Sequence, residues 1–140
     1  FSAASAFTKC QLLDDARNII EKAILEKSLV EGWDNRLLRV YRDAAGTEGS
    51  LALRTQIEHC EEWLKVQTKN PELELTLGVL CLQQKLWGKA QVHMEDALSH
   101  SVEPRTIREV NLNLAQLHEL LGQMDEAAKY YRQCAIATTL

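Results

Sequence analysis

Leu121-Gly122-Gln123-Met124-Asp125-Glu126-Ala127-Ala128-Lys129-Tyr130-Tyr131-Arg132-Gln133-Cys134 predicts a turn followed by a helix that packs closely on a neighbour. Gly122 suits the turn because glycine reaches left-handed backbone angles at little cost. Ala127, Tyr131 and Cys134 follow at helical spacing, so they lie on one face. A small, an aromatic and another small residue on one face fit the contact between two antiparallel helices. The stretch therefore predicts the turn and second helix of a helical hairpin.

The spacing of this hairpin occurs twice, at a shift of 37 residues. The two matching sets are Leu77, Gly78, Cys81, Ala90, Met94 and Ala97, and Leu114, Ala115, His118, Ala127, Tyr131 and Cys134. A helical hairpin that repeats every ~34 residues is the signature of the tetratricopeptide repeat. The shift here is 37 residues, so we expect a short insertion in the loop at residues 101–104. One hairpin cannot bury its own apolar face, whereas stacked copies can. The chain therefore resembles a tetratricopeptide-repeat array.

Weaker copies of the pattern precede these two. One copy, which predicts that the chain begins inside a repeat, consists of Ala4, Phe7, Ala16, Ile20 and Ala23. Another begins around Trp33, although its second helix, at residues 50–66, fits the pattern poorly. We expect one all-α domain over residues 1–140, a right-handed tetratricopeptide-repeat-like superhelix of about seven to eight antiparallel helices. The repeats are expected near residues 1–29, 30–69, 70–104 and 105–140, and the helices near residues 2–8, 13–27, 34–44, 50–67, 71–84, 87–100, 105–121 and 124–138.

Two residue types support this reading of the helices. Pro71 and Pro104 each suit the first turn of a helix, where the missing N–H costs nothing. Small residues allow helix axes to approach closely, and we expect this role for Gly78, Ala90, Ala97, Ala115 and Ala127.

Charge and motif content exclude several classes of function. The net charge is −4 and the basic residues are dispersed, which argues against a nucleic-acid-binding surface. No apolar run is long enough to span a membrane, so we expect a soluble piece of a longer protein. The sequence has no phosphate-binding glycine loop, nucleophile elbow or His-Glu-x-x-His motif. We therefore expect no enzymatic activity, no cofactor and no metal site.

Cysteine, histidine and tryptophan are better explained by packing and solvation than by chemistry. The four thiols, which lack metal-binding spacing and are expected to be buried, are Cys10, Cys60, Cys81 and Cys134. His93 and His100 are seven residues apart on one helix, which gives too few ligands for structural zinc. Trp33, Trp63 and Trp87 lie next to repeat-core positions, so they are expected to pack in the core rather than to form a cofactor cage.

Three segments of the chain carry a family resemblance. They are Cys60-Glu61-Glu62-Trp63-Leu64-Lys65, Asn70-Pro71-Glu72-Leu73-Glu74-Leu75-Thr76-Leu77-Gly78-Val79-Leu80-Cys81-Leu82 and Leu86-Trp87-Gly88-Lys89-Ala90-Gln91. Together they resemble the HemY family of proteobacterial membrane proteins. The resemblance covers the whole chain, which looks like the carboxy-terminal repeat region of such a protein. It implies an inner-membrane protein with two amino-terminal transmembrane helices and cytoplasmic repeats, linked to late steps of protohaem IX synthesis. An unrelated flavin oxidase shares the HemY name, but this sequence has no dinucleotide fingerprint.

The first helix of each stacked hairpin is expected to line a concave groove. The predicted groove residues are Asn35, Arg39 and Arg42, then Glu72, Leu75, Val79 and Leu82, then Glu109, Leu112, Gln116 and Glu119. In this interpretation Leu75, Val79 and Leu82 form an apolar anchor for a partner segment, while Arg39 and Arg42 hold a partner carboxylate. The alternative is that these leucines pack on a neighbouring repeat.

The groove leads to a hypothesis about function and leaves alternatives open. We expect a non-catalytic scaffold that binds protein partners, among them haem-pathway enzymes. A peptide-binding array unrelated to haem is the main alternative, because none of the groove residues is specific to haem. A haem or porphyrin carrier would need an axial ligand that faces an apolar cavity, for which His118 or His93 is the best candidate. A dimerisation module is a further alternative.

Overall fold

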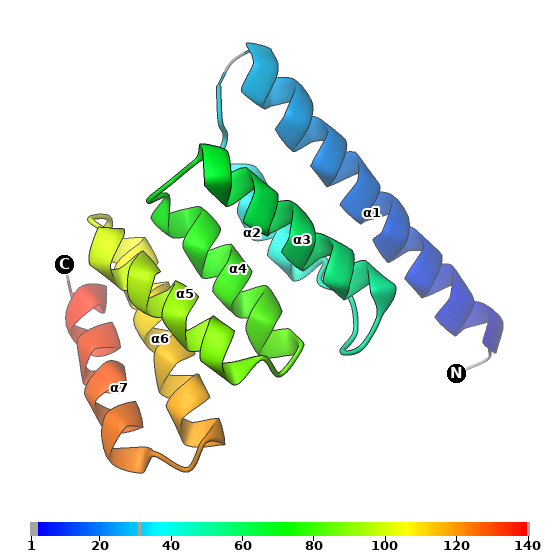
Figure 1. The fold of residues 1–140 in the computed structure, drawn as a ribbon. Helices are drawn as coiled ribbons and strands as arrows, with labels where there is room; N and C mark the ends of the chain where they lie inside the picture. Colours follow the sequence, from blue (N-terminus) through cyan, green and yellow to red (C-terminus); the bar gives the residue numbers. More distant parts are fainter. Residues whose placement is uncertain (1–2, 31, 140) are drawn as a thin grey trace.

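The chain folds as an array of helices. The computed structural model describes residues 3–30 and 32–139, and within them it contains helices and no strand. The seven helices are α1 (Ala3–Val30), α2 (Arg36–Asp43), α3 (Leu51–Val66), α4 (Pro71–Gln83), α5 (Trp87–His100), α6 (Pro104–Leu120) and α7 (Met124–Thr138) (Figure 1). The all-α class that the sequence predicts is therefore confirmed.

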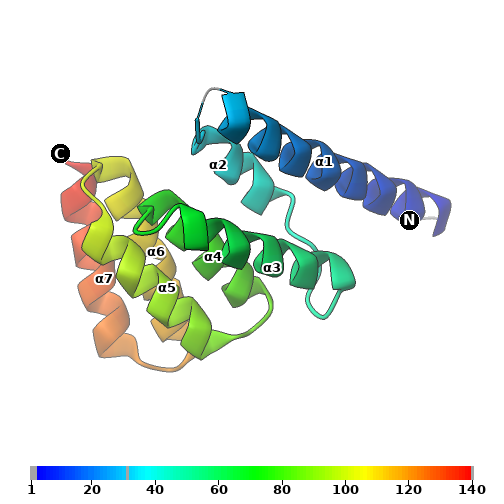
Figure 2. The ribbon, with the colours of Figure 1, turned by 45° about the horizontal axis from the view of Figure 1, so that its top comes forward.

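Neighbours in sequence are also neighbours in space. Helices α4 and α5 form one antiparallel hairpin and α6 and α7 form the next, with α5 packed against α6. Helices two apart in the order also touch, because α2 contacts α4 and α4 contacts α6. Helices α1 and α7 lie at opposite ends, and the start of α1 extends beyond α3 (Figure 2). The α2, α4 and α6 contacts place three helices that are distant in sequence along one side of the array.

The two hairpins turn in the same way. Lys85 and Gly122, which are 37 positions apart, both have left-handed backbone angles, with φ of 60° and 75°. After each of them the next backbone N–H bonds to a carbonyl five residues back: Leu86 to Cys81 at 2.9 Å, and Gln123 to His118 at 2.8 Å. Both hydrogen bonds are typical of a helix that is followed by one residue in the left-handed conformation, a position where glycine is favoured. The shift of 37 residues seen in the sequence is therefore repeated in the backbone of the turns.

Small residues allow α4 and α5 to pack closely, as the sequence predicts. A Cβ atom added to Gly78 would lie 2.8 Å from Cγ of Met94, nearer than real atoms approach. Ala90, Ala97 and Ala115 are fully buried, and Ala127 is 2% exposed. Larger side chains would force these helices apart, so the small residues set the spacing of the hairpins.

The core has two parts. The larger cluster joins α1 through α6 and contains Tyr41, Trp63 and Leu77, whereas the smaller cluster joins α4, α5 and α6 around Met94 and Leu114. In the larger cluster the Tyr41 and Trp63 rings lie 5.5 Å apart, and Trp33 and Trp87 pack against its edge. The tryptophans therefore belong to the core, as expected.

The thiols divide into two groups. Cys60 and Cys81 are fully buried, and burial raises the pKa of Cys81 to about 11. Cys10 is exposed and Cys134 is only half-buried, so the expectation that all four are buried is wrong for these two. Cys10 lies in the amino-terminal part of α1, where it lines an open pocket with Ala45 and Gly46.

The amino-terminal region differs from the sequence prediction. Helices expected at residues 2–8 and 13–27 are one continuous helix, α1, within the described residues. The stretch between them, Lys9-Cys10-Gln11-Leu12, contains neither glycine nor proline, so nothing ends the helix there. Arg17 anchors α1 to the end of α2 by donating to the Ala44 carbonyl at 2.9 Å, and Tyr41 donates to Glu21 at 2.6 Å. The segment is thus a single docked helix rather than a hairpin.

None of the helices in the described parts of the chain is long and apolar enough to cross a membrane.

Candidate partner-binding groove

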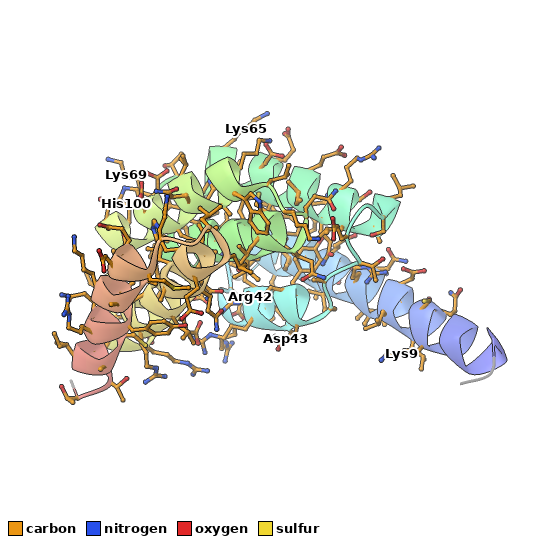
Figure 3. The ribbon with its side chains drawn as sticks, turned by 90° about the horizontal axis from the view of Figure 1, so that it is seen from below. Lys9, Arg42, Asp43, Lys65, Lys69 and His100 are labelled. Carbon is orange, nitrogen blue, oxygen red and sulfur yellow. The ribbon has the colours of Figure 1, made fainter. Side chains whose placement is uncertain are left out.

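Arg42 links three helices. Its Nη1 atom donates to Glu72 at 3.0 Å and to the Thr76 hydroxyl at 2.9 Å, both on α4, and its Nη2 atom donates to Glu109 on α6 at 2.8 Å. The Arg42 side chain is 10% exposed and reaches from α2 toward the other helices, whereas Asp43 points outward (Figure 3). One guanidinium group therefore connects α2, α4 and α6.

Glu72 is the other centre of this network. The residue is 4% exposed, and a buried carboxylate is stable only when partners satisfy its charge and lone pairs. Besides Arg42, it accepts hydrogen bonds from Arg39 Nε at 3.3 Å and from the Thr106 hydroxyl at 3.3 Å. The network of Arg39, Arg42, Glu72, Thr76, Thr106 and Glu109 thus satisfies its own buried charges.

This network changes the predicted role of the arginines. The sequence placed Arg39, Arg42, Glu72 and Glu109 in one groove, and the structure brings all four together. Arg42, however, binds carboxylates of this chain, so both of its Nη atoms are already occupied. Thr76 and Thr106 were missed by sequence reasoning. A signal for Thr76 exists, because it lies four residues after Glu72 and therefore on the same helical face.

Asn35 joins the beginnings of α2 and α4. Its Oδ1 atom accepts hydrogen bonds from Trp33 Nε1 at 2.8 Å and from Asn70 Nδ2 at 2.9 Å. Asn70 caps α4, since its own Oδ1 accepts from the backbone N–H groups of Glu72 and Leu73 at 3.1 and 3.3 Å. Asn35, a predicted groove residue, is therefore also a structural residue between the beginnings of α2 and α4.

An open pocket of about 360 Å³ lies beside the network. Its walls include Asn35, Arg36, Arg39, Glu72, Glu103 and Arg105. Arg36 bonds to Asp34, and the hydrogen bonds from Arg36 and Lys27 hold the pKa of Asp34 well below its usual range. We call this cavity the Arg39 pocket.

The predicted apolar anchor on α4 is largely part of the core. Leu75 is fully buried against Met94, Ala97, Val110 and Leu114, so the prediction that it offers a surface to a partner is wrong. Val79 and Leu82 are half-buried and pack against the same cluster. Leu112 on α6 is 38% exposed, so among the apolar residues predicted for the groove it is more accessible than Leu75, Val79 and Leu82.

The remaining predicted residues lie further along α6. Gln116 and Glu119 are exposed, and a hydrogen bond with Glu119 raises the pKa of Tyr131 on α7. The Glu119 carboxylate on α6 therefore bonds to Tyr131 on α7, the second helix of the same hairpin. Glu109 is half-buried and also lies 3.6 Å from Arg105 Nε, at the edge of the Arg39 pocket.

The two histidines considered as haem ligands differ in burial, since His118 is buried and His93 is half-buried. His118 is 5% exposed, its Nδ1 atom lies 2.6 Å from Gln123 Oε1, and its ring stacks on Tyr130 with 5.2 Å between centroids. The Tyr130 ring therefore covers one face of the imidazole. Burial lowers the pKa of His93 on α5. No group of three or more His, Cys, Asp or Glu residues in the described chain is arranged to hold a metal ion.

The fold defines an all-α protein built from stacked helices, with a charged network across three of them. No family model matches the chain, and no curated protein matches it in sequence.

Proposed function

We propose that this chain is a tetratricopeptide-repeat-like module that binds a protein partner in its groove and acts as a non-catalytic scaffold. The observation that carries the proposal is the Arg42 network, because it aligns α2, α4 and α6 along one side of the array. Equivalent turns at Lys85 and Gly122 support a repeated hairpin, and a right-handed superhelix of such hairpins forms a concave surface that suits an extended or helical segment.

The resemblance to the HemY family supports a more specific version of this proposal. In that version the full-length protein is anchored in the inner membrane, its repeats face the cytoplasm, and they gather enzymes of haem synthesis. The residues that carry it are the Leu86-Trp87-Gly88-Lys89-Ala90 turn and the preceding helix. Binding of a partner unrelated to haem is the second candidate, since the groove itself consists of ordinary polar and aliphatic side chains.

Affinity capture with the full-length protein tests both versions. Membranes from cells that express wild type, Leu112→Glu or Ile136→Glu would be solubilised, and the retained proteins identified by mass spectrometry. Both substitutions place a carboxylate at an exposed apolar residue, 38% exposed in the groove and 54% exposed on α7. We expect Leu112→Glu to lose a partner that wild type and Ile136→Glu retain, because a charge at the centre of an interface is costly.

The identity of the lost proteins separates the two versions. Haem-pathway enzymes among them support the HemY-like scaffold, and other proteins support the general binding module. If all three samples retain the same set of proteins, the groove is not the binding surface.

A further inference from the structure

We propose that the Arg39 pocket binds the carboxylate of an acidic side chain of the partner. This inference deepens the proposed function and rests on it. It gives Arg39 and Arg42 separate roles: Arg42 holds the three helices together, and Arg39 receives the ligand.

The free hydrogen-bonding capacity of Arg39 is the first observation. Its hydrogen bond to Glu72 is made through Nε at 3.3 Å, and neither Nη atom has a hydrogen-bond partner among the described residues. The Arg39 side chain is 29% exposed, compared with 10% for Arg42, and it lines the pocket. The outer edge of this guanidinium is therefore open to a ligand while its inner edge is fixed by Glu72.

The hydrogen bond from Arg39 to Glu72 favours ligand binding, because it holds the Arg39 side chain in place before a ligand binds. A free arginine loses side-chain freedom when it binds a ligand, which reduces affinity. Glu72 already restrains the Arg39 side chain, and Arg42 and the Thr106 hydroxyl in turn restrain Glu72. Much of the conformational entropy of the Arg39 side chain has therefore already been lost in the unbound protein.

The charge of the pocket is the second observation. Arg36, Arg39 and Arg105 line it together with Glu72 and Glu103, so positive charge is in excess at this place although the chain as a whole carries −4. The charge of Glu72 is further offset by Arg42. Arg36 pairs with Asp34, which Lys27 also neutralises at 3.0 Å, and Arg105 lies 3.6 Å from Glu109. Local charge therefore favours a single negative group rather than a strongly anionic ligand.

The geometry favours a carboxylate over phosphate or nucleic acid. Two adjacent N–H groups of a guanidinium match the two oxygens of a carboxylate. A phosphate group with nearly two negative charges meets more repulsion from Glu72 and Glu103, and a long polyanion meets the net negative charge of the whole chain. The volume of about 360 Å³ is enough for one or two residues of a peptide.

Nuclear magnetic resonance provides the test. The ¹⁵N-labelled chain would be titrated with N-acetyl-Ala-Asp-amide, which carries one side-chain carboxylate, with N-acetyl-Ala-Asn-amide and with inorganic phosphate, while the Nε–Hε signal of each arginine is followed. We expect saturable shifts for Arg39 with the acidic dipeptide and none with its neutral counterpart. Arg39→Gln should weaken binding about tenfold or more, since hydrogen bonds to charged groups are among the stronger ones.

Matched variants separate a lost contact from a lost fold. Arg132→Gln, at an exposed position of α7, should bind like wild type. Arg39→Lys, which keeps the charge without the fork, should bind with intermediate affinity. Thermal melts of each variant verify folding, and Glu72 keeps Arg42 and Thr106 as partners in Arg39→Gln.

Three results would overturn the inference. They are shifts confined to other arginines, equal binding by Arg39→Gln and Arg132→Gln, and tighter binding of phosphate than of the acidic dipeptide. None of these depends on the capture experiment with Leu112→Glu. The groove can therefore fail as a partner surface while the pocket still binds a carboxylate, and the reverse outcome is equally distinguishable.

Discussion

Arg42 on α2 and Glu109 on α6 are joined by a 2.8 Å hydrogen bond although 67 positions separate them in the sequence. The same guanidinium binds Glu72 on α4, so one side chain makes polar contacts with both of the other helices. Arg42 is nearly buried, and a buried ion pair stabilises a fold only when all its members are present.

Removal of Arg42 should therefore destabilise the chain. We expect Arg42→Met to lower the free energy of unfolding by about 2–4 kcal/mol, because it leaves Glu72 and Glu109 without their strongest partner. Arg39 and Thr106 still bind Glu72, which keeps the loss from being larger. Urea unfolding followed by circular dichroism measures the change.

A double variant tests whether the loss comes from the unpaired carboxylate. Arg42→Met with Glu72→Met should regain part of the stability lost in Arg42→Met, because the second change removes the uncompensated buried charge. Arg132→Met on the exposed face of α7 serves as the control and should change stability by less than about 0.5 kcal/mol. If Arg42→Met behaves like this control, the network contributes nothing to stability.

The turn at Lys85 offers a stabilising substitution. Lys85 has φ of 60°, where its Cβ is strained, whereas the equivalent turn has Gly122 at φ 75°. Lys85→Gly should raise stability by roughly 0.5–1 kcal/mol, and Gly122→Ala should lower it by a similar amount. Lys85→Ala distinguishes the effect of backbone strain from that of the exposed ion pair between Lys85 and Glu48 at 3.2 Å. This variant loses the ion pair but keeps a Cβ atom, and therefore the strain, at position 85. Equal melting temperatures for Lys85→Gly and Lys85→Ala would argue against backbone strain at this turn.

Close packing within the last hairpin predicts a third result. Ala127 is 2% exposed between α6 and α7, so Ala127→Leu should overpack the contact and cost about 1–3 kcal/mol. Ala128 is the next residue and is exposed, which makes Ala128→Leu a matched control. Thermal melts of the two variants compare them directly. An Ala127→Leu melt at the wild-type temperature contradicts the assignment of this helix face.

The helices could be predicted from sequence where local signals were strong. The bounds of α4, α5 and α7 follow from Pro71, from the Leu86-Trp87-Gly88 turn and from Gly122. The break expected inside α1 was wrong because the repeat spacing alone suggested it, and neither glycine nor proline marked it. Evidence from a repeat pattern is therefore weaker than evidence from a residue that ends a helix.

The groove was harder to predict than the helices. Helical spacing placed Arg39, Arg42, Glu72 and Glu109 on inward faces, but whether they bind each other or a partner depends on how closely α2, α4 and α6 approach. Leu75 shows the same difficulty. Most of α4 is buried because it lies in the middle of the array, so spacing alone could not show which of its faces is open. The distances between these helices are set by side-chain packing, which a single sequence does not reveal.

Thiol accessibility should follow the positions of the four cysteines. Cys10 is exposed and Cys134 is half-buried, so both should react with 5,5′-dithiobis(2-nitrobenzoic acid) in the folded chain at pH 8. Cys60 and Cys81 are fully buried, and burial raises the pKa of Cys60 as well as that of Cys81, so few of their thiols ionise at that pH. We expect two thiols to react in native buffer and all four in urea. Cys10→Ser should remove the fastest phase, and labelling of Cys60 or Cys81 at the rate of Cys10 would show that the α3–α4 contact opens readily.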